Sequence, residues 1–407
     1  MSAERVPPAQ PSGRRSSGAL AAQLGVPRAL QRYSRDLQRW RAGNSIRLLR
    51  GGAETFPAMV AAIEAASRSV CLETYIIDDD RTGRRITDAL CARARAGVTV
   101  RLLYDAVGGW GMASSFVDRL REAGVEVVEF HPIAPWRRRW GLSRRDHRKI
   151  LVVDDEVGFT GGLNLSDDYA ATADGGRGWH DIHCELRGPV VADLGRLFRR
   201  TWLYAHGRPY PAPPDASTVA GIAGGATFAR VLDNAFRRRR RVIRRAYLAA
   251  INAAEEDVLL ANAYFLPDRG LRAAMRRAVA RGVAVRVIVP GRSDVALVEL
   301  AGLYLYHRLA RAGVEILRWR GPMMHAKAAV VDGVWSTIGS YNLDSISLLR
   351  NLEVTVETLD PAHGAVMRAQ HQADRANCVR FDAAAWRALS WWRRAASWLA
   401  YQFERWL

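Results

Sequence analysis

The feature that most constrains this chain is a motif that occurs twice with identical spacing. In each copy a lysine follows a histidine by two residues, and an aspartate follows the lysine by five. A glycine and an asparagine then follow the aspartate by seven and ten residues. The copies are His147, Lys149, Asp154, Gly161 and Asn164, and His325, Lys327, Asp332, Gly339 and Asn342. Two copies in register indicate an internal duplication.

The lysines of the motif are chemically informative. The chain has 60 Lys and Arg residues, yet Lys149 and Lys327 are its only lysines. An ammonium is a compact point charge, whereas a guanidinium is a planar fork with several donors. We therefore interpret both lysines as functional residues.

The segments around each motif follow a β-α-β-α-β rhythm. In the first half, strands are expected at 45–49, 69–77, 98–104 and 125–130, with helices at 53–67, 82–96 and 114–123. In the second half, helices are expected at 237–255 and 271–281 and up to 312, with strands at 258–265, 283–289 and 314–319. This alternation predicts an α/β fold with two pseudo-equivalent domains, each a mixed, largely parallel sheet flanked by helices.

The predicted domains span residues 44–215 and 216–380, and the site is expected at their interface. Residues 1–43 read as an extension, disordered to about residue 25 and then helical, because Pro, Ser, Gly and Arg dominate its start. Residues 381–407 read as an amphipathic C-terminal helix rich in Trp and Arg. The spacing of the glycines predicts C-caps at Gly97, Gly124, Gly282 and Gly313.

The two motifs together suit chemistry at a phosphodiester. Alternate residues of a strand point the same way, so each motif presents His and Lys on one face. If the two domains meet, two imidazoles, two ammoniums and two amides converge on one cleft. Lysine and asparagine would bind non-bridging oxygens, one histidine would attack phosphorus, and the other would protonate the leaving alkoxide. No carboxylates form a cage, so we expect neither a metal nor another cofactor.

Charge and aromatic residues indicate an anionic surface as a partner. The net charge is +19, which favours polyanions or an anionic membrane. The segment 135–145, the arginine run 237–245 and the Trp-rich tail 386–407 suit a lipid interface. No apolar run reaches 18 residues. The four cysteines show no metal-binding spacing and read as buried thiols.

The paired motifs resemble the phospholipase D superfamily, and their surroundings look like bacterial cardiolipin synthases. The segments that carry the likeness are 159–164, 179–181, 264–267, 338–344 and 350–354, within a resemblance spanning about 44–360. The likeness is to the shorter synthases, which lack two N-terminal membrane spans.

The resemblance implies a role for each site residue. His147 would be the nucleophile that forms a phosphohistidine and His325 the general acid, although the reverse assignment stays open. The phosphate would be bound by Lys149, Lys327, Asn164, Asn342 and Ser340. Asp154 and Asp332 would stabilise the motif, and Asp181 and Glu353 would each orient a histidine of the opposite half. Gly162 departs from the family pattern, because many members have serine there.

The resulting hypothesis is a phosphatidyltransferase that uses phosphatidylglycerol as donor and acceptor, with phosphatidylethanolamine as another donor. A phospholipase D or nuclease using the same histidines is the alternative, although the aromatic rim and tail disfavour nucleic acid as a partner. A non-catalytic scaffold for anionic lipid is the third. The enzyme would lie peripherally on the cytoplasmic side of a bacterial membrane. The sequence does not indicate an oligomeric state.

Overall fold

The computed structural model describes residues 31–33, 39–134, 136, 141, 144–210, 221–234 and 241–407. Four predictions fall wholly or largely outside these residues. They are the extension before residue 41, most of the segment 135–145, the domain boundary at 215/216 and the arginine run up to residue 240.

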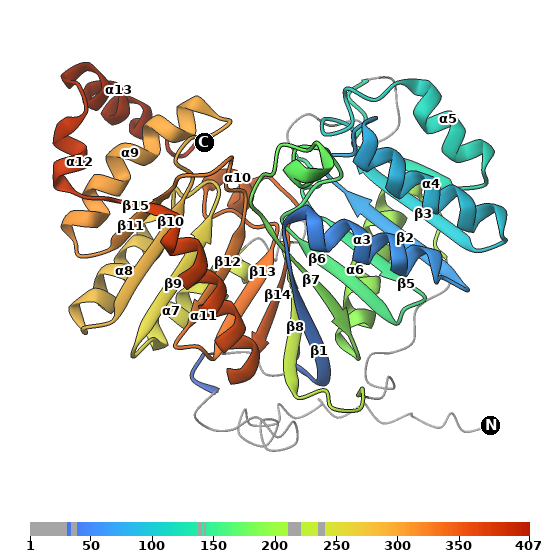
Figure 1. Ribbon diagram of the computed structural model, residues 1–407, viewed down its shortest axis with the longest axis horizontal. Helices are drawn as coiled ribbons and strands as arrows, with labels where there is room; N and C mark the ends of the chain where they lie inside the picture. The colour runs from blue at the N-terminus through green and yellow to red at the C-terminus, as the bar shows by residue number, and fades with distance from the viewer. Residues whose placement is uncertain are drawn as a thin grey trace, which may run out of the picture.

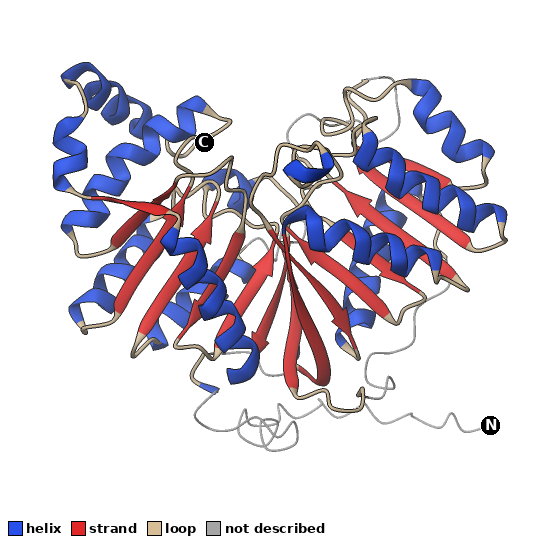
Figure 2. Cartoon of the chain, viewed as in Figure 1, coloured by secondary structure: helices blue, strands red, loops and turns tan. Residues whose placement is uncertain are grey.

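One continuous sheet of 15 strands runs through both halves of the chain, in the order β15-β11-β10-β9-β12-β13-β14-β8-β1-β7-β6-β5-β2-β3-β4. Figure 1 shows the two halves as separate lobes that meet at β8 and β1, and Figure 2 shows helices on both faces of the sheet. The first half contains β1 (Arg41–Arg50), α3 (Gly51–Glu64), β2 (Ser69–Thr74), α4 (Arg81–Arg95), β3 (Thr99–Asp105), α5 (Ser114–Glu122), β4 (Glu126–Phe130), β5 (Ile150–Val153), β6 (Val157–Gly161), β7 (Ile182–Arg187) and α6 (Val190–His206).

The second half repeats this order. It contains β8 (Thr227–Asp233), α7 (Val242–Ala253), β9 (Asp257–Asn262), α8 (Arg269–Ala280), β10 (Ala284–Val289), α9 (Ala296–Arg311), β11 (Glu315–Trp319), β12 (Lys327–Val331), β13 (Trp335–Gly339), α10 (Ser345–Leu349), β14 (Val354–Leu359), α11 (Pro361–Ala376), β15 (Cys378–Phe381), α12 (Ala383–Ala388) and α13 (Trp391–Gln402). The predicted glycine C-caps are confirmed, because Gly97, Gly124, Gly282 and Gly313 all have φ between 87° and 93°.

The mixed α/β class is confirmed, but the expectation of a largely parallel sheet is wrong. In the described chain the parallel pairs are β2 with β3, β3 with β4, β9 with β10 and β10 with β11. The strands after each motif histidine instead form antiparallel meanders, β5-β6-β7 and β12-β13-β14. The first two strands of each meander, β5 with β6 and β12 with β13, are joined by a turn too short for the crossover that parallel strands need. The turns use left-handed residues, including Asp155 at φ 59° and Gly333 at φ 63°.

The two half-sheets join through β1 and β8, which pair antiparallel with an irregularity between Arg41 and Asn44. Asn44 is fully buried and its side chain donates to the carbonyl of Thr227 (3.1 Å) and accepts from the amide of Val190 (2.9 Å). The join is therefore stabilised by side-chain as well as ladder hydrogen bonds.

The C-terminal segment is not the single helix that its pattern predicts. Residues 378–381 form β15 against β11, and the helical part is broken between α12 and α13. Leu389 and Ser390 are extended there, with ψ of 140° and 151°. In the described part of the chain, no helix is both long and apolar enough to cross a membrane.

Candidate active site

Both motif histidines sit just before a central strand, and each is tied to the other half of the chain. The amide of His147 donates to the carbonyl of Leu352 (3.0 Å), and the amide of His325 donates to the carbonyl of His180 (2.7 Å). Leu352 and His180 immediately precede Glu353 and Asp181. The backbone thus carries each of these carboxylates to the histidine of the opposite half.

Each histidine contacts the carboxylate that is brought to it in this way. His147 Nδ1 lies 3.1 Å from Glu353 Oε2, and His325 Nδ1 lies 2.8 Å from Asp181 Oδ2. Each carboxylate therefore contacts the histidine of the opposite half, as expected from the resemblance. A carboxylate at Nδ1 accepts that N–H, which leaves Nε2 as the nitrogen available for chemistry. Burial and the lysines lower the pKa of both His147 and His325, and burial raises the pKa of Asp181 to about 7.

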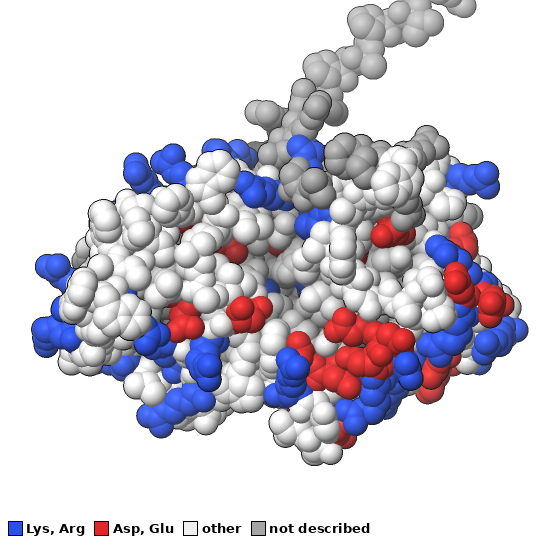
Figure 3. Space-filling view, turned by 90° about the horizontal axis from the view of Figure 1, so that it is seen from above, with Lys and Arg blue, Asp and Glu red and all other residues white. Residues whose placement is uncertain are grey.

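The two histidines line one pocket of about 420 Å³, to which both halves contribute. The rest of its lining is Tyr75, Ile76, Asp78, Asn164, Ser166, Asp168, Tyr169, Trp179, Tyr264, Asp294, Val295, Val298, Asn342, Asp344, Ile346, Ser347, Asn351 and Leu407. Figure 3, which looks onto this end of the molecule, shows a central hollow with acidic side chains beside it and basic ones mainly around the periphery. The pocket lies at the junction of the two halves, where the site was expected from the sequence.

The two lysines are buried beside the histidines. Lys149 Nζ donates to the carbonyl of His147 (2.8 Å), and Lys327 Nζ donates to the carbonyl of His325. Burial lowers the pKa of Lys149 to about 7 and that of Lys327 to about 8, since few groups replace the lost hydration. A phosphate anion near them would favour their charged form.

The two asparagines of the motifs also reach the pocket. Asn164 donates through Nδ2 to the Tyr169 hydroxyl (2.8 Å) and accepts from the amide of Ile76 (3.3 Å). Asn342 is buried, and its Oδ1 has no hydrogen-bond partner among the described residues. A substrate hydroxyl or amide flip would satisfy this oxygen.

Ser340, like Lys149 and Lys327, is a predicted phosphate ligand that does not line the pocket. It is fully buried, and its hydroxyl donates to Glu353 and accepts from the amide of Val354 (3.1 Å). In the first half, a Cβ added to Gly162 would lie 2.2 Å from Asp181 Oδ1. A side chain there would displace the Asp181 carboxylate, so glycine leaves the room that this carboxylate occupies. The two halves therefore hold their carboxylates differently.

The aspartates of the motifs are not brought to the histidines. Asp154 accepts from the amides of Ser67, Arg68 and Ser69 at 2.7–2.8 Å. Asp332 accepts from the amides of 255–257 at 2.8–2.9 Å and from the Tyr33 hydroxyl. These contacts anchor the turns that begin β2 and β9, as a motif-stabilising role requires.

Sequence reasoning missed the aromatic residues of the site. Tyr75 and Tyr264 follow equivalent strands, and their rings meet those of His147 and His325 edge-on at 4.9 and 6.1 Å. Tyr169 places its hydroxyl 3.1 Å from His325 Nδ1. The equivalence of Tyr75 and Tyr264 in the repeat was the available signal; Tyr169 has no counterpart that would have identified it.

Arg148, which lies inside the first motif, is another residue that was missed. It is 1% exposed and donates to Glu73 (3.4 Å) and to the Thr201 hydroxyl (2.7 Å). It also lies 3.9 Å from Asp233 of β8. Arg148 thus links β2, α6 and the first strand of the second half beneath His147.

Among described residues, no group of three His, Cys, Asp or Glu side chains is arranged to hold a metal.

The comparisons with known proteins agree with the duplicated motif. A family model described as a cardiolipin synthase, PLD-like domain matches residues 59–187 and again residues 247–375. Two solved structures share the fold: phosphatidylserine synthase of Haemophilus influenzae Rd KW20 (TM-score 0.68, 14% identity, 95% of this chain and 97% of that one) and polyphosphate kinase of Porphyromonas gingivalis (TM-score 0.58, 16% identity, 84% and 49%).

Curated relatives are more similar in sequence. Cardiolipin synthase A of Pseudomonas aeruginosa (strain LESB58) is 36% identical over 346 residues, which cover 84% of this chain and 69% of that protein. Cardiolipin synthase B of Salmonella typhimurium (strain LT2) is 34% identical over 378 residues, covering 90% and 89%. The chain therefore belongs to the cardiolipin synthase family of phospholipase D-like proteins.

Proposed function

We propose that this protein is a phosphatidyltransferase that joins two phosphatidylglycerol molecules and releases glycerol. One observation carries the proposal: two histidines, each held by a carboxylate of the opposite half, line a single pocket. Membership of the cardiolipin synthase family supports phospholipids as the substrates.

The reaction would proceed in two displacements at phosphorus. His147 Nε2 attacks the phosphorus of the donor, and the bond from phosphorus to the glycerol oxygen breaks. His325 gives its proton to that oxygen, so glycerol leaves and a phosphohistidine remains. The hydroxyl of the second lipid then loses its proton to His325 and attacks phosphorus, which frees His147. The reverse assignment of the histidines remains an alternative.

The buried lysines would stabilise the charge of the transition state. Lys149 and Lys327 carry the positive charge nearest the histidines, and each couples electrostatically to Glu353 and Asp181. Charged donors fixed in a site with little water contribute more than the same donors in solution. Asn164 and Asn342 would add neutral hydrogen bonds to the phosphate oxygens or to the headgroup.

The composition of the pocket disfavours a nuclease. Among the described residues, its lining includes Asp78, Asp168, Asp294 and Asp344 but no lysine or arginine, since Lys149 and Lys327 are buried and do not line it. A nucleic acid carries a phosphate on every nucleotide, so the phosphates flanking the reacting one would meet carboxylates. A phosphodiester lipid has one phosphate and meets this difficulty less. Water in place of the second lipid would give a phospholipase D reaction at the same residues.

We further propose that α13 holds the protein on the membrane. The polar side of this helix packs on the protein: Arg393 contacts Glu299, and Ser397 is fully buried. The apolar side faces outward: the exposed large side chains are Trp391, Trp392, Trp398 and Leu399 of α13 and, after its end, Phe403 and Trp406, each 51–76% exposed. Such an orientation suits burial in the interfacial layer of a bilayer. Attachment on the cytoplasmic side remains part of the proposal.

The test supplies phosphatidylglycerol vesicles and, separately, single-stranded DNA, with EDTA present throughout. We expect diphosphatidyl product and free glycerol from the native protein, and neither from His147→Gln or His325→Gln. Protein quenched in a neutral denaturant, because the P–N bond of a phosphohistidine is acid-labile, should carry a phosphatidyl group on His147, located by mass spectrometry of peptides. DNA cleavage without lipid turnover would establish the nuclease instead, and vesicle binding with no turnover would establish the scaffold.

A further inference from the structure

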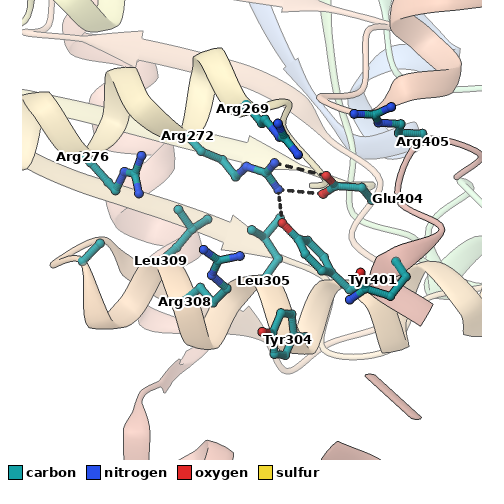
Figure 4. Close-up of a pocket in the computed structure, with 12 residues that line it drawn as sticks. Arg269, Arg272, Arg276, Tyr304, Leu305, Arg308, Leu309, Tyr401, Glu404 and Arg405 are labelled. Atoms are coloured by element: carbon teal, nitrogen blue, oxygen red, sulfur yellow. Dashed lines mark hydrogen bonds and ion pairs between the residues drawn. The ribbon is translucent and has the colours of Figure 1, made fainter. Parts of the chain in front are cut away.

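A second pocket lies on the outer side of the C-terminal half, between α8, α9 and the end of α13 (Figure 4). Its volume is about 740 Å³, larger than that of the histidine pocket. Among its twelve lining residues are five arginines and one carboxylate. The arginines are Arg269, Arg272, Arg276, Arg308 and Arg405.

Among the described residues, a carboxylate pairs with one of these five arginines. Arg272 donates to both carboxylate oxygens of Glu404 (2.7 and 3.2 Å) and to the Tyr401 hydroxyl. The other four make no ion pair with a carboxylate in the described part of the chain. Figure 4 shows the arginines of α8 across the pocket from Arg308 of α9. Like charges gathered around one hollow repel each other, and a bound anion would remove that repulsion.

We propose that this arginine pocket binds the phosphate headgroup of an anionic phospholipid, separately from the histidine pocket. Guanidinium groups present planar pairs of N–H donors that match the oxygens of a phosphate. Exposed arginines are free to adjust to the ligand, and Arg272 is already held in place by Glu404. The inference rests on the proposed membrane function, because it places the lipid surface at α13.

The surroundings of the pocket favour a lipid over a soluble phosphate. Glu404 and Arg405 line the pocket, whereas their neighbours Phe403 and Trp406 are 52% and 68% exposed. A headgroup in the pocket would thus leave its acyl chains beside the outward aromatic side chains. Leu407 lines the histidine pocket, so the segment 403–407 borders both pockets. Both would then be reached from the same lipid surface.

The test removes two exposed arginines that hold nothing else in place. Arg276→Gln/Arg308→Gln is compared with Arg85→Gln/Arg95→Gln, a matched pair of exposed α4 arginines outside both pockets. Binding is measured by co-sedimentation with phosphatidylcholine vesicles, with and without phosphatidylglycerol. Adding phosphatidylglycerol raises the vesicle affinity of the native protein, and we expect this increase to be about 10- to 30-fold smaller in the pocket variant. The α4 variant should stay within about twofold of the native protein.

A third variant and two soluble competitors complete the experiment. Arg276→Lys/Arg308→Lys retains the charge and should recover part of the binding, but not all, because the fork geometry is lost. Inorganic phosphate and glycerol 3-phosphate are added to native protein on vesicles. We expect little displacement by either; displacement at millimolar concentration would show a soluble phosphate site and overturn the lipid assignment. Equal losses in the pocket and α4 variants would show charge attraction without a site.

The two proposals fail in different ways. Vesicle binding that ignores Arg276 and Arg308, together with normal product formation, would overturn the arginine pocket and leave the transferase. Binding that depends on these arginines without any lipid turnover would overturn the transferase and leave the pocket. Melting temperatures of all variants, measured alongside, show that losses of binding come from folded protein.

Discussion

Lys149 and Lys327 carry charges that their surroundings oppose. Burial lowers the pKa of Lys149 to about 7 and that of Lys327 to about 8, so the free protein loses these charges as the pH rises through that range. The pKa of His147 is below its ordinary value of 6.5, so this nucleophile is neutral at and above that pH. His325 must carry a proton to act as the general acid, and its pKa is also lowered, chiefly by burial.

We therefore expect a bell-shaped pH profile of kcat/KM. It should fall on the acid side as His147 becomes protonated and on the alkaline side as the general acid His325 loses its proton; the loss of the lysine charges between about pH 7 and 8 should steepen the alkaline limb. The alkaline limb of kcat should lie higher, because bound phosphate raises the pKa of both lysines.

Lys149→Arg provides the check on this assignment. A guanidinium does not titrate in this range, so less activity should be lost between about pH 7 and 8 than in the native protein. The rate at pH 7 should fall by roughly 10- to 100-fold, because the planar fork does not fit the position of the ammonium. An alkaline limb that is unchanged from the native protein in both Lys149→Arg and Lys327→Arg would contradict the role of the lysines.

Gly162 and Ser340 occupy equivalent positions but support their carboxylates in different ways. A side chain at Gly162 would collide with Asp181 Oδ1 at 2.2 Å, so we expect Gly162→Ser to push Asp181 away from His325. Activity should fall by roughly 10- to 100-fold, about what one charged hydrogen bond supplies. The exchange at the other half, Ser340→Gly, creates no collision and should cost less. Measuring kcat of both variants at saturating lipid would show which exchange costs more activity.

At the scale of elements, the motif aspartates belong to turns rather than to chemistry. Asp332 holds the amides of 255–257 at the start of β9. We expect Asp332→Ala to lower the melting temperature by roughly 3–6 °C, since several amides lose their acceptor. The kcat of the protein that stays folded should change less than about threefold. His325→Gln, the control, should show the opposite pattern of unchanged melting and lost activity.

The same aspartates give a stability that depends on pH. Burial opposes ionisation, but hydrogen bonds keep the pKa of both aspartates below the ordinary value of 3.8: backbone amides donate to Asp154, and the Tyr33 hydroxyl and backbone amides donate to Asp332. The stabilisation is therefore complete above pH 4 and is lost as the pH falls through these lowered values. Native protein should show this acid loss, and Asp332→Ala should show less of it in melts between pH 3 and 5.

The outward face of α13 can be tested by itself. Trp391 and Trp392 are 76% and 60% exposed, so Trp391→Ser/Trp392→Ser should fold normally and lose at least tenfold of its affinity for phosphatidylcholine vesicles. Turnover of a short-chain, micellar substrate should fall much less. Unchanged vesicle binding would show that another surface holds the membrane.

Local sequence pattern predicted the elements better than their pairing. The β-α-β segments and their glycine caps follow from periodicity and from left-handed residues at fixed places. The meanders β5-β6-β7 and β12-β13-β14 were misjudged, because the alternation with helices elsewhere suggested a mixed sheet that is largely parallel. The turn at Asp154–Asp155 was a visible sign that no crossover helix could intervene.

The site shows the same division between motif and tertiary context. The histidines, lysines and asparagines are predictable because the repeat marks them. Tyr169 and Arg148 are not, because their roles arise from segments that meet only in three dimensions. The break in the C-terminal helix also escaped prediction, because a helical wheel registers side-chain period but not the extended backbone at Leu389 and Ser390.

At the scale of the whole molecule, the two halves are bound into one sheet. Beyond the β1–β8 ladder, Arg148 of the first half lies against Asp233 of the second, and the motif histidines donate backbone hydrogen bonds across the junction. We expect a single calorimetric unfolding transition, whose van't Hoff and calorimetric enthalpies agree. Asn44→Ala should lower its temperature without dividing it; two separate transitions would contradict the coupling.

The continuous sheet also fixes how this site handles water. Many transfer enzymes exclude solvent by closing one lobe on another, but lobes that share a sheet through β1 and β8 have no hinge between them. The spacing of the reacting nitrogens is then built into the backbone. Water must therefore be excluded by whatever fills the mouth of the pocket, and the acyl chains of the lipid can do this without a moving lid. Transfer should outcompete hydrolysis in intact bilayers and yield to it in dilute detergent.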